Sequence, residues 1–129
     1  MSALNAMQAA IPHMRTQGGG VIVNVSSGTT QAILPGVAPY SSTKHALNNL
    51  SLVARAELAP DHIRVSVVYP FITDTDFARN AVMAGEERRQ AGPLRGDPPE
   101  YAAGLILEAI ETGATEVYAE QVRRLSQRG

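Results

Sequence analysis

The chain has 129 residues, of which 44% are hydrophobic and 18% are charged, a composition typical of a globular domain and not of a disordered chain. Eleven basic and twelve acidic residues give a net charge of −1, which argues against binding to nucleic acid or to an anionic membrane. Without cysteines, a membrane-length apolar run or a signal peptide, we expect a cytoplasmic protein that lacks disulfides, thiolate catalysis and cysteine-ligated metals.

The first predicted element is a helix over residues 3–14. Leu4, Met7 and Ile11 recur at three- and four-residue steps, so they share one face of a helix. Pro12 lies near the predicted end, where a proline is expected to bend the helix.

A turn and a short strand come next. Residues 18–20 are glycines, and a phosphate-binding glycine loop would have to follow a strand and open a helix, so we interpret them as a turn. Val21–Val25 is a β-branched apolar run, typical of a buried strand in a parallel sheet. Asn24 interrupts the run and is expected to form a local hydrogen bond. Ser27 falls just after the strand, at the edge where open α/β sheets carry their sites.

A long helix and a second strand follow. The helix is predicted over residues 40–58, with Ser41 or Ser42 as its N-cap, and the strand over residues 63–68. Strand, helix and strand at this spacing form a βαβ unit, whose crossover is nearly always right-handed. The sequence therefore predicts an α/β fold with a parallel sheet.

The last third of the chain contains a loop, a helix and a strand. Residues 71–98 are rich in Gly, Pro and charge, and we expect a lid loop over a site. A helix is predicted over residues 99–112 with Gly113 as its C-terminal cap, followed by a strand over residues 116–119. The basic pair Arg123–Arg124 is interpreted as part of a solvated tail.

Three side chains of the central stretch form a candidate catalytic group. Tyr40 and Lys44 are four residues apart on the predicted helix, so they share one face. A lysine ammonium beside a tyrosine favours the phenolate, which makes the tyrosine a usable general acid or base. Ser27 can donate a hydrogen bond to a carbonyl or alcohol oxygen. The group can polarise a carbonyl and move a proton, while hydride has to come from a nicotinamide cofactor.

This arrangement resembles the active site of the short-chain dehydrogenase/reductase (SDR) family. That family has a Tyr-x-x-x-Lys motif on a helix and a serine thirteen positions before the tyrosine, which selects Ser27 over Ser26. The strand and serines of residues 22–27 (IVNVSS) are also similar to the family pattern. The resemblance implies that Tyr40 is the catalytic acid/base and that Ser27 orients the substrate. It implies that Lys44 assists the tyrosine and holds the nicotinamide ribose.

A second family landmark lies in the segment YPFITDT, residues 69–75. The family commonly has Pro-Gly-x-Val/Ile-x-Thr at this place, where the chain passes the nicotinamide. Phe71 and Thr73 depart from this pattern, whereas Pro70 and Thr75 match it. The resemblance implies cofactor contacts from Pro70, Thr73 and Thr75, in addition to those of the tyrosine and lysine.

The resemblance covers only the C-terminal half of a typical family member. It implies the C-terminal half of a doubly wound parallel-sheet (Rossmann-type) fold, with residues 1–129 as one partial domain and the nucleotide-binding half missing. The strand over Val21–Val25 would then expose an edge, which invites pairing. We expect the isolated chain to be inactive, because hydride transfer needs a bound cofactor. The family also implies homo-oligomers, through the helices over residues 3–14 and 40–58.

The expected function is that of an oxidoreductase that interconverts an alcohol and a ketone or aldehyde with NAD or NADP. A small-molecule substrate is implied, but its identity and the choice of cofactor are not. Two alternatives stay open, a truncated interaction module without catalysis and an SDR-type epimerase or dehydratase. No metal site is expected, since His13, His45 and His62 do not have metal-ligand spacing.

Overall fold

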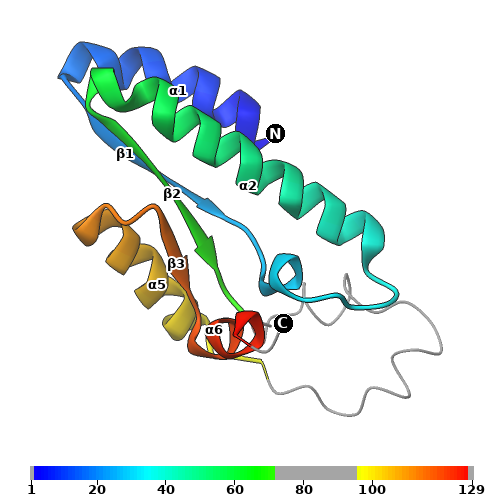
Figure 1. The fold of residues 1–129 in the computed structure, drawn as a ribbon. Coiled ribbons are helices and arrows are strands. Elements are labelled where there is room, and N and C mark those ends of the chain that lie inside the picture. The colour runs from blue at the N-terminus through cyan, green and yellow to red at the C-terminus, as the bar shows by residue number, and fades with distance from the viewer. Residues whose placement is uncertain (1, 72–95, 128–129) are drawn as a thin grey trace.

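The computed structural model describes residues 2–71 and 96–127. Within these residues three parallel strands form one sheet, in the order β1-β2-β3, with helices on both faces (Figure 1). The strands are β1 (Gly20–Val25), β2 (Ile63–Tyr69) and β3 (Glu116–Tyr118). The α-helices are α1 (Ala3–Gln17), α2 (Ala38–Leu58), α5 (Pro99–Thr112) and α6 (Glu120–Ser126), and the two short 3-10 helices are η1 (Gly28–Gln31) and η2 (Ala59–Asp61).

The register of the sheet brings the carboxyl ends of the strands to one edge. β1 pairs with β2 from Gly20 opposite Ile63 to Val25 opposite Val68. β3 pairs with the last three residues of β2. Parallel strands need crossover connections, which α2 and α5 supply. The prediction of an α/β fold with a parallel sheet is therefore confirmed.

Two hydrophobic cores pack against the sheet. α1 and α2 lie side by side on one face, and α5 lies on the other (Figure 1). The core under α1 and α2 consists of Met7, Ala54, Leu58, Ile63 and Val65. The second core surrounds the carboxyl end of β2 and includes residues of α5, and it consists of Val67, Val68, Tyr69, Leu105, Ala109, Val117, Ala119 and Val122. Because β2 contributes to both cores, its apolar run is almost entirely buried.

Helix α1 is longer than predicted and continues through its proline. It begins after Ser2, whose side chain accepts a hydrogen bond from Asn5 N, and it ends at Gln17 rather than at residue 14. Gly18 then takes the left-handed conformation (φ 84°) and caps the last turn. Pro12 therefore lies inside the helix, where it cannot donate a backbone hydrogen bond to the preceding turn.

The C-terminal segment is the main element that the sequence pattern did not predict. Residues 120–126 form α6 and not a solvated tail, and α6 brings a fully buried Val122 against η1. Arg124 pairs with Glu120 one turn away on the exposed side. Helix α6 is thus short and amphipathic, with Val122 buried on one side and the two arginines exposed on the other.

One arginine joins three separate segments at the amino-terminal half of the sheet. Arg55 of α2 donates from Nη1 to the carbonyl of Val65 on β2, at 2.7 Å. Its Nη2 donates to the carbonyl of Gly113, the C-cap of α5, at 2.8 Å. A planar guanidinium can satisfy two fixed acceptors at once, so it ties both helix layers to the central strand.

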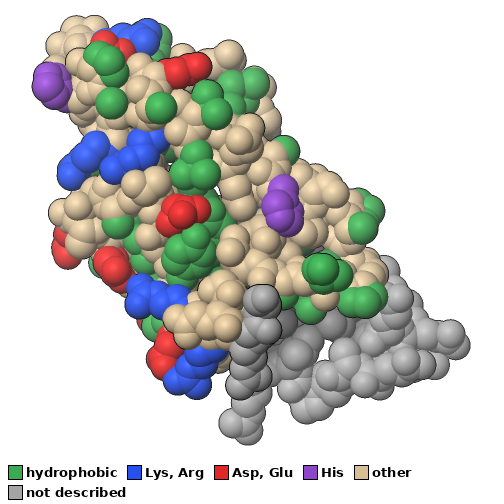
Figure 2. Space-filling model, viewed as in Figure 1, with side chains coloured by type: hydrophobic (Ala, Val, Ile, Leu, Met, Phe, Trp, Pro, Cys, Tyr) green, Lys and Arg blue, Asp and Glu red, His purple; other side chains and the backbone are tan. Residues whose placement is uncertain are grey.

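The surface is consistent with a compact α/β unit that has open edges. Figure 2 shows hydrophobic side chains in the middle of one face, between the layer of α1 and α2 and the layer of α5.

Over residues 2–71 and 96–127, no helix combines the length and apolar character needed to cross a membrane. In the same part of the chain, no three His, Cys, Asp or Glu side chains gather as a metal site would require.

Candidate active site

The serine of the candidate site lies where β1 leaves the sheet. Ser26 N still donates to the carbonyl of Val68, at 2.8 Å, as the last contact with β2. Ser27 follows in an extended conformation and caps η1, with its Oγ accepting a hydrogen bond from Thr29 N at 3.2 Å. The predicted position of Ser27, at the carboxyl edge of a parallel sheet, agrees with the structure.

Helix α2 places the tyrosine and the lysine over the same edge. Lys44 Nζ donates to the carbonyl of Val25, the last residue of β1, at 3.2 Å. The same Nζ lies 5.7 Å from the centre of the Tyr40 ring. Both side chains are half-buried. The predicted shared face of Tyr40 and Lys44 is therefore directed toward the end of β1.

Two hydrogen bonds fasten the serine turn to this helix. Ser41 Oγ donates to the carbonyl of Thr29 at 3.2 Å, and Asn48 Nδ2 donates to Thr30 Oγ1 at 3.2 Å. Since Ser41 directly follows Tyr40, the first bond brings the Ser27 turn next to the tyrosine. The expectation that Ser41 or Ser42 caps the helix is wrong. Val37 is the N-cap and makes no side-chain cap, because valine has no hydrogen-bonding side-chain atom, and the Ser41 hydroxyl bonds the serine turn instead.

A buried polar contact sets the position of α2 against β1. Asn24 Nδ2 donates to Ser51 Oγ at 2.8 Å, and Ser51 Oγ donates to the carbonyl of Leu47 at 2.7 Å. Both side chains are buried. The expected local hydrogen bond of Asn24 is therefore wrong, because the partner is 27 residues away on α2. An asparagine inside an apolar strand indicated a special role, but nothing in the sequence named its partner.

The end of β2 and α6 complete the surroundings of the serine turn. Gly28 N donates to the carbonyl of Pro70 at 2.9 Å, so this predicted cofactor-binding residue lies against the turn that carries Ser27. A Cβ on Gly28 would lie only 2.6 Å from Val122 Cγ2 of α6. Glycine is thus required by close packing. The other predicted contacts, Thr73 and Thr75, lie outside the described residues.

The predicted lid over residues 71–98 falls almost entirely outside the described residues as well. Only its first residue, Phe71, and residues 96–98 are described. Phe71 is half-buried and packs against the core that contains Tyr69 and Leu105. The lid therefore remains a prediction.

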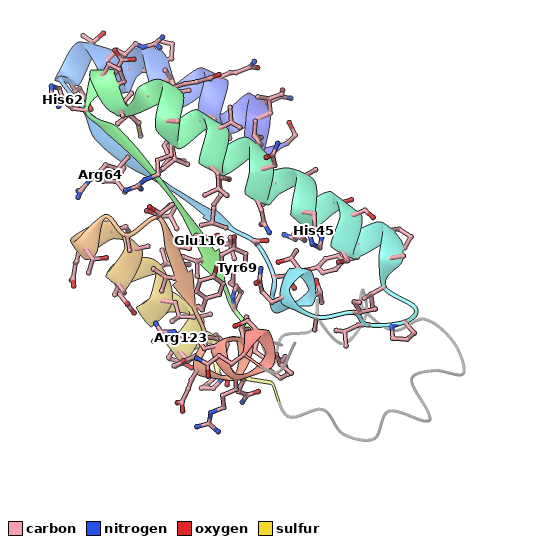
Figure 3. The ribbon with its side chains drawn as sticks, viewed as in Figure 1. His45, His62, Arg64, Tyr69, Glu116 and Arg123 are labelled. Carbon is pink, nitrogen blue, oxygen red and sulfur yellow. The ribbon has the colours of Figure 1, made fainter. Side chains whose placement is uncertain are left out.

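A second polar cluster lies between β2 and β3. Tyr69 donates from its hydroxyl to Glu116 Oε1 at 2.6 Å, and its ring stacks on Tyr118 with centroids 4.5 Å apart (Figure 3). Burial, reinforced by the Glu116 carboxylate, raises the pKa of Tyr69 far above its ordinary value and that of Tyr118 to about 12. Both phenols therefore stay protonated at neutral pH and are poor candidates for acid–base work.

The comparisons with known proteins bear on the family. A family model described as short chain dehydrogenase matches residues 1–85, the part that carries β1, α2, β2 and the three candidate catalytic side chains. The chain belongs to the short-chain dehydrogenase family. The family expected from the serine, tyrosine and lysine spacing is thereby confirmed.

Similar short-chain dehydrogenases span about twice the length of this chain. An uncharacterized oxidoreductase from Methylorubrum extorquens is 42% identical over 128 residues, which cover 95% of this chain and 50% of that protein. The 2,3-dihydro-2,3-dihydroxybenzoate dehydrogenase of Escherichia coli is 33% identical over 108 residues, covering 84% and 43%. A short chain dehydrogenase from Burkholderia cenocepacia, solved in complex with NADP, superposes with a TM-score of 0.80 at 34% identity, covering 96% and 49%. The predicted fold class, part of a Rossmann-type sheet, is confirmed.

The residues at the edge of β1 fit the nicotinamide end of such a cofactor. A lysine ammonium has three N–H donors, and within the described residues Lys44 uses one of them, on the Val25 carbonyl. The remaining donors suit the hydroxyl groups of a ribose. Residues 18–20, in contrast, lie at the start of β1 and therefore at the opposite end of the strand from Ser27. Gly18 and Gly19 form the predicted turn between α1 and β1, whereas Gly20 is the first residue of the strand.

Proposed function

We propose that this chain is the catalytic part of an NAD- or NADP-dependent oxidoreductase that interconverts an alcohol with a ketone or aldehyde. The observation that carries the proposal is the contact of Lys44 Nζ with the Val25 carbonyl, at 3.2 Å. This contact holds α2, and with it Tyr40, over the strand end that continues into Ser27. The three groups that the family motif requires would then act together at one edge of the sheet.

Each side chain has a separate task in this mechanism. The nicotinamide, when bound, supplies or accepts the hydride. Ser27 donates a hydrogen bond to the substrate oxygen and polarises the carbonyl. Tyr40 gives its phenolic proton to that oxygen during reduction and takes it back during oxidation. Lys44 provides a positive charge beside the phenol and hydrogen-bond donors for the ribose.

Further parts of the proposal follow from the family and from the length of the chain. The backbone of Pro70, together with Thr73 and Thr75, would contact the nicotinamide, and residues 71–98 would close over the substrate. Residues 1–129 would form one partial domain. The pyrophosphate of the nucleotide would then be held by residues other than these. The chain on its own is therefore expected to be inactive. A cytoplasmic location stays a prediction from the amino-acid composition.

We also propose self-association through α1 and α2. Leu4 on α1 and Leu52 and Val53 on α2 are large hydrophobic side chains that are 43%, 38% and 47% exposed. Exposed large apolar side chains on these two helices support an interface between copies. Replacing Val53 with Asp should shift the mass of the purified chain in solution toward the monomer. An unchanged mass distribution would count against this interface.

A second candidate function is an interaction module without catalysis. β1 is an outer strand of the described sheet, and Val25 at its end is 41% exposed. An open strand edge can pair with a strand of another chain. Under this proposal the side chains of the candidate site would have no catalytic role.

Calorimetric titration with NADH and NADPH separates the two candidates. The purified chain is tested together with a chimera, in which it replaces the matching residues of the Methylorubrum extorquens oxidoreductase. We expect the chimera to bind one of the two cofactors and to turn over a carbonyl substrate. Tyr40→Phe should reduce turnover at least a hundredfold and leave cofactor binding within about twofold. A chimera that binds neither cofactor, or a Tyr40→Phe variant with full turnover, would refute the oxidoreductase proposal.

A further inference from the structure

The hydroxyl of Ser27 makes two hydrogen bonds to one residue, Thr29. A serine hydroxyl has one hydrogen to donate and two lone pairs that accept. Ser27 Oγ accepts one hydrogen bond from Thr29 N, at 3.2 Å, and a second from Thr29 Oγ1, at 3.0 Å. Both acceptor positions are therefore occupied by the same residue. What remains available for a substrate is the hydroxyl hydrogen.

We infer that Thr29 is a positioning residue, which holds Ser27 as a hydrogen-bond donor toward the substrate oxygen. The inference rests on the proposed function and deepens it. Because its lone pairs are filled, Ser27 can polarise a carbonyl oxygen but cannot accept the proton of a substrate alcohol. The proton of the alcohol then has one destination, the phenol oxygen of Tyr40. Thr29 thus separates the two roles that two neighbouring hydroxyl groups could otherwise share.

Thr29 is itself held in place from the helix that carries the tyrosine. Its carbonyl accepts a hydrogen bond from Ser41 Oγ at 3.2 Å. The next residue, Thr30, donates from Oγ1 to the Ser27 carbonyl at 2.9 Å and accepts from Asn48 Nδ2 at 3.2 Å. A threonine side chain is also restricted at χ1 by its branched Cβ. The donor direction of Ser27 is therefore set relative to α2 and not only within its own turn.

Capping of η1 explains only one of the two hydrogen bonds between Thr29 and Ser27, the bond from the backbone N–H. An N-cap serine needs the backbone N–H of Thr29, which any residue at that position supplies. The bond from Thr29 Oγ1 adds nothing to the cap. Thr29→Val keeps the backbone N–H and the shape of the side chain but removes the hydroxyl, whereas Thr29→Ser restores the hydroxyl. These two variants therefore separate a capping role from a positioning role.

Neutron diffraction from deuterated crystals of the 129-residue chain tests the inference without any turnover. We expect the Thr29 hydroxyl deuteron on the line to Ser27 Oγ, and the Ser27 deuteron directed away from Thr29. Thr29→Ser should preserve this direction, and Thr29→Val should release it. A Ser27 deuteron that lies on Thr29 Oγ1 in the unaltered chain would overturn the inference.

Steady-state kinetics of the chimera give a second readout. Thr29→Val should lower kcat for a carbonyl substrate about tenfold with KM within about twofold, because a donor is misdirected and not removed. Thr29→Ser should recover kcat to within about threefold, and all three proteins should share one unfolding midpoint. Full kcat in Thr29→Val, or equal losses in both variants, would overturn the inference. If the unaltered chimera has no turnover, the proposed function fails, and the neutron positions still decide the role of Thr29.

Discussion

Gly28 offers a sharp test of how α6 completes the serine turn. In Gly28→Ala the new Cβ would lie 2.6 Å from Val122 Cγ2 and 3.3 Å from the Pro70 carbonyl oxygen. The first distance is far below van der Waals contact, and Val122 is fully buried, so α6 or the turn has to move. Overpacking of this kind destabilises a protein by about 1–3 kcal/mol. We therefore expect Gly28→Ala to lower the unfolding midpoint by about 3–10 °C.

The cause can be isolated with a double-mutant cycle in thermal unfolding. Val122→Ala alone should cost about 1–3 kcal/mol, because it leaves a cavity, but it also removes the clashing methyl group. In the double variant the alanine Cβ has room, so the combined loss should fall short of the sum by about 1 kcal/mol or more. Gly104→Ala is the control, since a Cβ there meets nothing within 4 Å. Additive losses, or an unchanged midpoint in Gly28→Ala, would refute the packing argument.

The remaining predictions concern the buried polar groups. The unfolded state loses its tyrosine protons near pH 10, whereas burial raises the pKa of folded Tyr118 to about 12. Between these pH values the folded state binds more protons than the unfolded state. The free energy of unfolding should therefore fall as the pH rises from 10 to 12. Thermal melts of the chain and of Tyr118→Phe over this range check it, and equal slopes would contradict it. Asn24→Ala should cost about 1–3 kcal/mol in chemical denaturation, through a lost buried hydrogen bond to Ser51. Asn49→Ala, at an exposed position on α2, should stay within about 0.5 kcal/mol, and equal effects of the two changes would contradict a special role for Asn24.

Elements with strong local signals were predictable to within a residue or two. Helix α5 has the predicted limits because Pro99 fits its first turn and Gly113 takes the left-handed cap conformation. The strands were recognisable because β-branched runs buried in a parallel sheet need no alternation of polar and apolar residues. The spacing of Ser27 and Tyr40 named both residues before any geometry was known, although their catalytic roles remain predictions.

What the sequence could not provide was contact between distant segments. Helix α6 has one buried apolar residue, Val122, which packs against Gly28. This contact exists only in the folded chain, so the local sequence could not predict it. Ser41 looked like a helix cap because serine is a good one, yet tertiary contact with the serine turn determines its hydrogen bond. Nothing in the sequence indicated a role for Thr29, because its hydrogen bond to Ser27 Oγ is known only from the structure.

The Arg55 contacts give α2 a fixed point at the end of the sheet remote from the site. Lys44 precedes Arg55 by eleven residues, a lever arm of about 16 Å along a helix that rises about 1.5 Å per residue. A tilt of about 4° around Arg55 would then move Lys44 by about 1 Å, and misplacement of that size can cost about a hundredfold in rate. By bonding the carbonyls of Val65 and Gly113, the Arg55 guanidinium thus restrains the orientation of α2, the helix that carries Tyr40. Substitutions at Arg55 should therefore be judged by turnover as well as by stability.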